Sequence, residues 1–219
     1  LGATWAVLQP VLTMVVFSLF FGRLAGVPSG GVPYPITTFA ALLPWTLFAY
    51  ALTQSSNSLV DNAEVVKKVY FPRLIMPVAA TLSGLVDFVI AFAVLLAMMA
   101  AYGIAPTAAI VTLPFFVVLA VAAALAVGVW LSALNVQYRD VRYTITFLTQ
   151  FLLFVSPVAY QTTLVPEQWR TLYSLNPMVG VIDGFRWALL GQEAPGWSLA
   201  VSTTATLVLL VAGLYYFRR

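Results

Sequence analysis

The sequence predicts an all-α, polytopic membrane protein with six transmembrane helices and no soluble domain of any size. Of its 219 residues, 62% are hydrophobic and only 8% are charged, and the mean hydropathy is +0.99. A soluble domain carries roughly 25% charged residues, so most of this surface must face lipid. The apolar runs are long and unbroken, as from Met76 to Tyr102, whereas a membrane barrel would alternate apolar and polar residues. Backbone groups in lipid need partners within their own segment, which makes these runs helices.

The positions of the spans follow from the lengths of the apolar runs, because crossing about 30 Å of hydrocarbon takes about 20 helical residues. In chain order, we expect spanning helices at about residues 3–22, 36–60, 76–101, 108–134, 144–160 and 198–217. Since the chain begins at Leu1 inside the first run, and not at a Met, we also expect the full-length protein to have a further N-terminal segment.

The basic residues fall unequally on the two sides of these spans and thereby orient the chain. One side holds most of them: Lys67, Lys68, Arg73, Arg139, Arg142, Arg218 and Arg219. The other side holds Arg23, Arg170 and Arg186. Because cytoplasmic loops carry the excess of Lys and Arg, we expect both termini in the cytoplasm. Topology, rather than nucleic-acid binding, then accounts for the net charge of +3.

The polar stretch 61–74 predicts a short helix in a cytoplasmic loop. Asp61-Asn62 suits a helix start, and Glu64 is spaced to pair with Lys67-Lys68 on the next turn. Phe71-Pro72-Arg73 then ends the helix and turns the chain back into the membrane. Such a helix suits docking to a partner protein, and a simple interfacial connector is the alternative.

The outer segment 161–197 is unlike an aqueous loop, because it is rich in aromatic residues and Leu. Pro166-Glu167 suits a helix start and Asn176-Pro177 breaks that helix. A second helix at about 178–190 can end at Gly191. Neither helix is long enough to span, so we expect an outer-side hairpin that is re-entrant or interfacial. The alternative is a seventh span, which would move the C-terminus outside and spoil the charge asymmetry.

Several kinds of chemistry are excluded by composition. The chain contains no His and no Cys, which excludes His-based catalysis and Cys/His zinc sites. It has no Gly-x-x-x-x-Gly-Lys-Ser/Thr loop for ATP, and we expect neither an enzyme nor a cofactor or metal site in this chain. Asp87 is the one acid deep in a span, where an ionised carboxylate costs about 2.5–3.5 kcal/mol. It is either an ion site or a structural carboxylate that is hydrogen-bonded to a neighbouring helix or simply protonated, and the lack of a deep basic partner favours the second.

Short motifs between about residues 60 and 190 occur in the order seen in one known family. They are Phe71-Pro72-Arg73-Leu74-Ile75-Met76-Pro77, Ser83-Gly84-Leu85-Val86-Asp87-Phe88, Tyr138-Arg139-Asp140-Val141-Arg142-Tyr143, Ser156-Pro157-Val158, Val165-Pro166-Glu167-Gln168-Trp169-Arg170, Leu175-Asn176-Pro177-Met178 and Gly184-Phe185-Arg186. Together they resemble the membrane subunits of ABC-2 type polysaccharide exporters. The resemblance is nearest to the O-antigen exporter permeases of the Wzm type, with capsule and teichoic-acid permeases as close relatives.

The resemblance implies that 1–219 is a single ABC-2 transmembrane domain and that two copies form a homodimer in the bacterial cytoplasmic membrane. It implies two separate ATPase subunits, which hold ATP and Mg. The implied substrate is a lipid-pyrophosphate-linked polysaccharide, which moves to the outer leaflet through a pore in the dimer. We expect membrane lipid to be a further partner of the chain, and we expect no binding to nucleic acid. The alternatives are an ABC-2 permease for a small lipid or drug, and an ATPase-independent carrier or channel that uses Asp87.

The resemblance also implies roles for three sets of residues. The loop after the second span would be a coupling helix that touches the ATPase through Asn62, Glu64, Lys67, Lys68, Tyr70, Phe71 and Arg73. The outer hairpin would act as a gate with Pro157, Glu167, Trp169, Arg170, Asn176, Pro177 and Arg186. The first and fifth spans would line the pore with Phe17, Phe20, Phe147, Phe151, Phe154 and Tyr160. Pro157 would bend the fifth span near its outer end.

Overall fold

The computed structural model describes residues 2–68, 70–138 and 140–218, with side chains from residue 7 onward. Within these ranges the chain is all-helical and contains no strand, which confirms the all-α part of the prediction. The α-helices are α1 (Gly2–Phe17), α2 (Tyr34–Asp61), α3 (Ala63–Lys68), α4 (Ile75–Leu82), α5 (Gly84–Ala101), α6 (Leu113–Gln137), α7 (Val141–Val155), α8 (Glu167–Tyr173), α9 (Pro177–Leu190) and α10 (Trp197–Arg218). A π-helix, Ser18–Leu24, continues α1, and 3-10 turns occupy Ala108–Thr112 and Thr162–Leu164.

Five helical segments in the described ranges are long and apolar enough to cross a membrane. They are Val7–Leu24, Tyr34–Asp61, Ile75–Ala101, Ala108–Gln137 and Trp197–Arg218. These match the first four predicted spans and the last one. The chain is therefore a polytopic membrane protein, as its composition requires.

The fifth predicted span is shorter than expected. α7 has 15 residues, which rise only about 22 Å. The expected helix over 144–160 is wrong at its C-terminal end, because α7 stops at Val155. A proline sterically keeps the residue before it out of the helical conformation, and Ser156 is extended, with φ −94° and ψ 152°. Pro157 therefore follows the helix and does not bend it, contrary to the prediction.

The third predicted span is broken at Ser83, which separates α4 from α5. The Ser83 hydroxyl donates to the carbonyl of Ala80 at 2.7 Å, a local bond that competes with the helical ladder. Gly84 then lies against the ring of Tyr50 on α2, so closely that a Cβ atom would stand 2.7 Å from Cδ1. The backbone at Gly84, directly after the break, thus lies close to α2.

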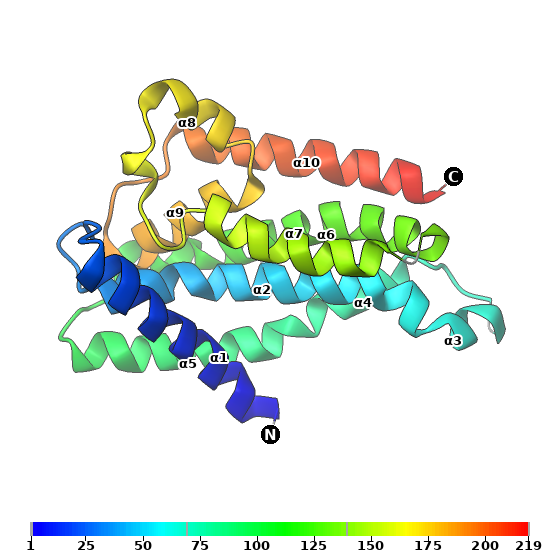
Figure 1. Ribbon diagram of the computed structural model, residues 1–219, viewed down its shortest axis with the longest axis horizontal. Coiled ribbons are helices and arrows are strands. Elements are labelled where there is room, and N and C mark those ends of the chain that lie inside the picture. The colour runs from blue at the N-terminus through cyan, green and yellow to red at the C-terminus, as the bar shows by residue number, and fades with distance from the viewer. Residues whose placement is uncertain (1, 69, 139, 219) are drawn as a thin grey trace.

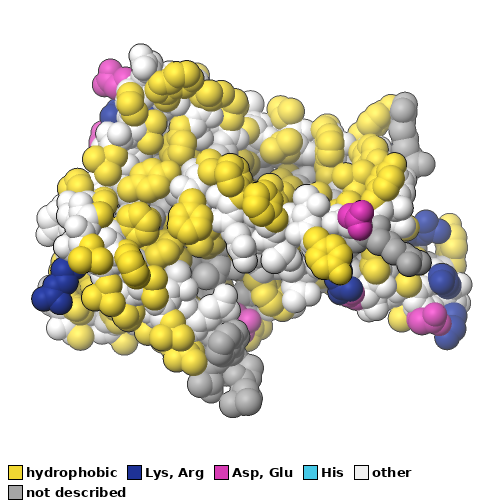
Figure 2. Space-filling model, in the orientation of Figure 1, with side chains coloured by type: hydrophobic (Ala, Val, Ile, Leu, Met, Phe, Trp, Pro, Cys, Tyr) yellow, Lys and Arg dark blue, Asp and Glu magenta, His cyan; other side chains and the backbone are white. Residues whose placement is uncertain are grey.

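α2 is the central helix of the molecule. Its buried residues run from Ile36 to Leu59, and it packs against α1, α4, α5, α6, α7 and α9. Most of the long helices run along the length of the molecule, with α3 at one end and α8 at the other (Figure 1). The C-terminal end of α10 lies at the same end as α3. Hydrophobic side chains cover most of the face seen in Figure 2, whereas most of the charged ones lie toward the two ends.

The segment that we expect on the outer side consists of α8, which is exposed, and α9, which lies inside the bundle against α2, α6 and α10. Asn176 caps α9, because its side-chain oxygen accepts from the backbone N–H of Met178 at 3.0 Å. Pro177 is the first helical residue, and Gly191 ends the helix in the left-handed conformation, with φ 65°. The predicted second helix and its Gly191 stop are confirmed. With 14 residues, α9 rises about 21 Å and is too short to span.

Candidate functional site

α3 projects from one end of the molecule with its charged side chains in solvent (Figure 1). Glu64 and Lys68 form an i,i+4 ion pair of 3.1 Å on it. The Asn62 side chain turns back to donate to the carbonyl of Ser58 at 2.8 Å, so it stabilises the last turn of α2 and does not cap α3. The residues proposed to contact the ATPase are exposed, apart from partly buried Phe71: Asn62, Glu64, Lys67, Lys68, Tyr70 and Arg73.

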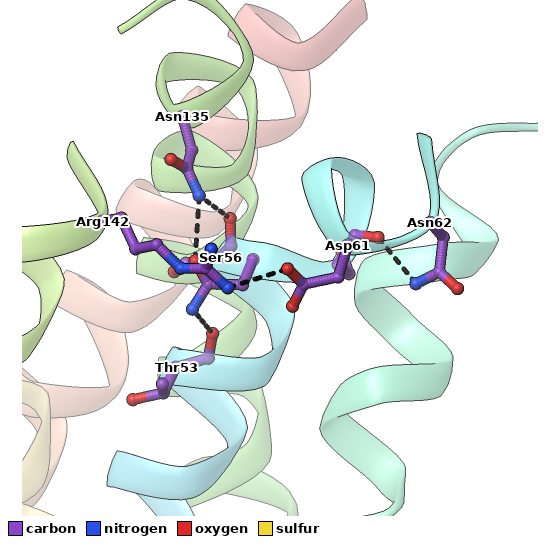
Figure 3. A network of polar contacts seen from close by, with 8 residues as sticks. Thr53, Ser56, Asp61, Asn62, Asn135 and Arg142 are labelled. Atoms are coloured by element: carbon purple, nitrogen blue, oxygen red, sulfur yellow. Dashed lines mark hydrogen bonds and ion pairs between the residues drawn. The ribbon is translucent and has the colours of Figure 1, made fainter. Parts of the chain in front are cut away.

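A polar network joins this end of α2 to α6 and α7 (Figure 3). Asp61, the last residue of α2, pairs with Arg142 in the first turn of α7, with 2.9 Å between Oδ1 and Nη2. On α6, the Asn135 amide donates to the carbonyl of Ser56 at 3.1 Å and to Oδ1 of Asn57 at 3.0 Å. The segment after α2 is thereby tied to the start of α7. Sequence reasoning used Arg142 only for topology and missed its pairing with Asp61, because the two residues lie far apart in the chain.

One face of α7 carries a stripe of exposed aromatic rings. Phe147 is 69% exposed, Phe151 is 53% exposed, and their rings stack with centroids 6.2 Å apart. Phe154 and Tyr143 lie on the same face at helical spacing and are also exposed. Tyr143 was missed, although its position four residues before Phe147 was a usable signal. We call Tyr143, Phe147, Phe151 and Phe154 the aromatic stripe.

The other predicted pore aromatics are placed differently. Phe20 is exposed on the π-helix. Phe17 is buried between Phe21 and Phe154, with ring centroids at 5.4 and 6.5 Å. Tyr160 is half-buried, and its hydroxyl lies 2.9 Å from that of Tyr173 on α8. In this arrangement Phe17 and Tyr160 are packing residues, and Phe20 and the aromatic stripe are the rings open to a ligand or a second chain.

The chain after α7 is irregular but buried, and Arg186 of α9 satisfies its backbone. The two Nη atoms of Arg186 donate to the carbonyls of Tyr160 and Val158, each at 2.9 Å. The Tyr34 hydroxyl donates to the carbonyl between them, that of Ala159. Irregular backbone inside a membrane protein requires such partners, because lipid offers none. Arg186 is only 3% exposed, and its guanidinium acts as a clamp on this turn.

The remaining residues predicted for the gate lie on α8 and at the start of α9. The Asn176 amide donates to Oγ of Ser156 at 2.9 Å, which ties the start of α9 to the end of α7. Arg170 donates to the carbonyls of Val165 and Thr163 at 2.9 and 3.0 Å. Glu167 and Trp169 are exposed on α8.

Asp87 lies in the first turn of α5, exposed on the surface of the subunit. It lines a cavity of about 380 Å³ between α1, α2, α5 and α7, together with Gln9, Thr13, Tyr50 and other polar residues. The favoured expectation was a structural carboxylate, either hydrogen-bonded to a neighbouring helix or simply protonated. In the described part of the chain Asp87 forms neither a hydrogen bond nor an ion pair, so the expected hydrogen bond is not found within one subunit.

Comparison with known proteins places the whole arrangement in context. Residues 1–190 match the profile of the family described as "ABC-2 type transporter". The O-antigen export system permease protein RfbA of Myxococcus xanthus is 29% identical over 96% of this chain and 81% of its own length. A protein of the same name from Klebsiella pneumoniae is 24% identical over 100% of this chain and 84% of its own length. The polysialic acid transport protein KpsM of Escherichia coli is 23% identical, over 100% and 85%.

Proposed function

The chain belongs to the ABC-2 type transporter family, and on that premise we propose that it is the membrane subunit of an ATP-driven exporter of a lipid-linked surface polysaccharide. The protein is a multi-pass protein of the bacterial inner membrane. Relatives named for O-antigen export and for polysialic acid transport align with almost all of it, which supports a polysaccharide as substrate. None of these full-length relatives is named for a small lipid or drug, the alternative substrate.

The aromatic stripe of α7 is the observation that carries this proposal. A large exposed apolar surface on a subunit is expected to be covered by lipid or by another chain. We place the stripes of two copies face to face across a pore in a homodimer. The flat faces of aromatic rings meet the C–H groups of sugar rings without fixing a register, so a polymer slides past Phe147 and Phe151. In this proposal α7 and the clamped turn after it, residues 156–160, together form the fifth span in chain order. The total is then six spans, with both termini in the cytoplasm.

The energy for export must come from another chain in this proposal, since this sequence has no P-loop. We assign two ATPase subunits to the end of the molecule that carries α3. A displacement of α3 by the ATPase reaches α7 through the ion pair between Asp61 and Arg142. The helix that bears the aromatic stripe is therefore the element that responds to ATP binding.

The proposal is tested by deleting the subunit from its native strain and by co-purification. Deletion is expected to remove one surface polysaccharide and to leave its lipid-linked form inside the cell. The full-length subunit, co-expressed with its candidate ATPase, is expected to copurify with it in detergent. A strain whose surface glycans are all unchanged, or a subunit that never binds the ATPase, contradicts the proposal.

A further inference from the structure

We propose that a polar cavity at the outer end of each subunit binds a short, uncharged segment of the exported glycan through its hydroxyl groups. The cavity measures about 480 Å³, within the usual range for small-ligand sites. It lies among α8, α9 and the loop before α10, at the end of the molecule opposite α3 (Figure 1). This inference rests on the proposed export function and adds a site apart from the aromatic stripe.

The inner wall of the cavity is formed by α9. Asp183 faces the cavity, and one of its oxygens accepts from the Thr162 hydroxyl at 2.9 Å. Arg186 stands one turn further along, but its guanidinium is committed to two carbonyls of the clamped turn and to the carbonyl of Thr37 on α2. In the described residues the second oxygen of Asp183 accepts no hydrogen bond, which leaves it free for a ligand hydroxyl.

The opposite wall of the cavity is formed by the amide side chains of Gln161 and Gln192, which lie next to Gly30. Gln192 donates to the carbonyl of Ser29 at 3.0 Å, which ties the loop before α2 to the loop before α10. Gly30 has a φ of 70°, and a Cβ atom on it would stand 2.7 Å from Nε2 of Gln161 and 3.3 Å from Nε2 of Gln192. A residue without a side chain is thus needed for both amides to line the cavity together.

The charge balance of the lining points to an uncharged ligand. The carboxylates of Asp183 and Glu193 are offset by the guanidiniums of Arg170 and Arg186. A phosphate would meet two carboxylates, and no cluster suited to a metal ion occurs in the described residues. What the lining presents is a mixture of planar donors and acceptors, which matches sugar hydroxyls because each of them both donates and accepts.

The rim of the cavity adds an apolar platform. Trp197, the first residue of α10, is 74% exposed at this rim. An exposed indole offers a flat apolar face together with a polar N–H, a combination that suits one face of a sugar ring. The same cavity adjoins Thr162 and Arg186, so a bound sugar lies beside the turn that follows the aromatic stripe. The site would hold the polymer as it leaves the pore.

The test uses the full-length subunit with its ATPase in phospholipid nanodiscs, and the delipidated surface polysaccharide of the native strain as probe. Binding is followed by tryptophan fluorescence and by calorimetry. Trp197→Ala and Asp183→Asn are each expected to raise the Kd by about tenfold, the loss of one good contact. Glu193→Gln is a third variant and is also expected to weaken binding. Because Glu193 is exposed, this substitution leaves folding intact.

Matched controls come from two residues of α8 that do not line the cavity, Glu167 and Trp169. Trp169 is 54% exposed and Glu167 is exposed, so Trp169→Ala and Glu167→Gln repeat the chemical changes at the same end of the molecule. Both are expected to leave the Kd unchanged. Normal binding by the Trp197 and Glu193 variants, or equal losses in the α8 variants, overturns the inference.

Two further arms separate the sources of failure. Nanodiscs with and without a galactosyl diglyceride are compared, and a response of Trp197 to this glycolipid but not to the polysaccharide overturns the inference in favour of a lipid headgroup. If deletion of the subunit leaves every surface glycan in place, the export function itself fails. If deletion blocks export while the cavity variants bind normally, only the cavity assignment fails.

Discussion

Asp61 and Arg142 form a 2.9 Å ion pair between the last residue of α2 and the first turn of α7, although 81 positions separate them in the chain. Both side chains are about half exposed, and such a pair contributes only about 0–1 kcal/mol to stability. We therefore infer that the ion pair matters for the two elements that it connects and not for stability. It is a direct link between the segment that carries α3 and the helix that carries the aromatic stripe.

Arg142→Glu is expected to lower the amount of polysaccharide exported per ATP hydrolysed by about fivefold or more. A factor of about five corresponds to the lower end of typical coupling free energies, about 1 kcal/mol. The reversed charge repels Asp61 and separates α7 from the end of α2. Protein level and thermal unfolding should stay near the wild type, because the pair is exposed. Adding Asp61→Arg restores the pairing and should recover much of the coupling. A double variant no better than the single one contradicts the link.

Phe151→Ala is expected to slow export by about tenfold without loss of folded protein, because the ring is exposed in the subunit and contributes one sugar contact. The readout is surface polysaccharide per cell at equal subunit level. Phe115→Ala on α6 serves as the control, since Phe115 is 51% exposed and lies on another helix. Equal effects of the two substitutions would assign the stripe to lipid contact.

Arg186→Lys is expected to destabilise the subunit by about 1–3 kcal/mol, because one ammonium group leaves at least one buried carbonyl of the clamped turn without a donor. Thermal unfolding in detergent measures this. Arg170→Lys is the matched control: its guanidinium also donates to two loop carbonyls, but it is less buried and water replaces the lost bonds. Similar losses in both variants would remove the clamp role of Arg186.

Gly184→Ala is expected to cost about 1–3 kcal/mol or more through overpacking. A Cβ atom at this position would overlap the Phe116 ring of α6. Gly196→Ala is the control, because nothing lies within 4 Å of the added atom. Phe116→Leu combined with Gly184→Ala should recover part of the loss in an unfolding experiment. No loss in Gly184→Ala would mean that α9 is not held against α6.

Asp87→Asn is expected to leave both stability and export nearly unchanged, since Asp87 makes no bond within the described part of the subunit. Export should also continue when the proton gradient is collapsed and ATP is maintained. A gradient requirement that disappears in the Asp87→Asn variant would instead favour an ion-coupled carrier with its site in the 380 Å³ cavity.

Features set by near neighbours in the chain were predictable. The Asn176-Pro177 start and the Gly191 stop of α9 depend on hydrogen bonds and φ angles within a few residues, and both are confirmed. The resemblance to ABC-2 transporters rested on short motifs and is confirmed by the match over residues 1–190. One local error, the extent of the fifth span, had a local cause: Pro157 ends α7 where hydropathy alone continues it.

By itself, the sequence determined that this chain is a bundle of apolar helices in a membrane, because 62% hydrophobic and 8% charged residues leave no other solvent for its surface. It did not determine how each helix is turned. Tertiary structure alone decided that Phe17 is buried while Phe151 is exposed, and that Arg186 reaches the carbonyl of Val158. The reason is physical: α1, α7 and α9 are apolar on several sides, so packing against α2 sets their rotation, and rotation decides which side chains meet.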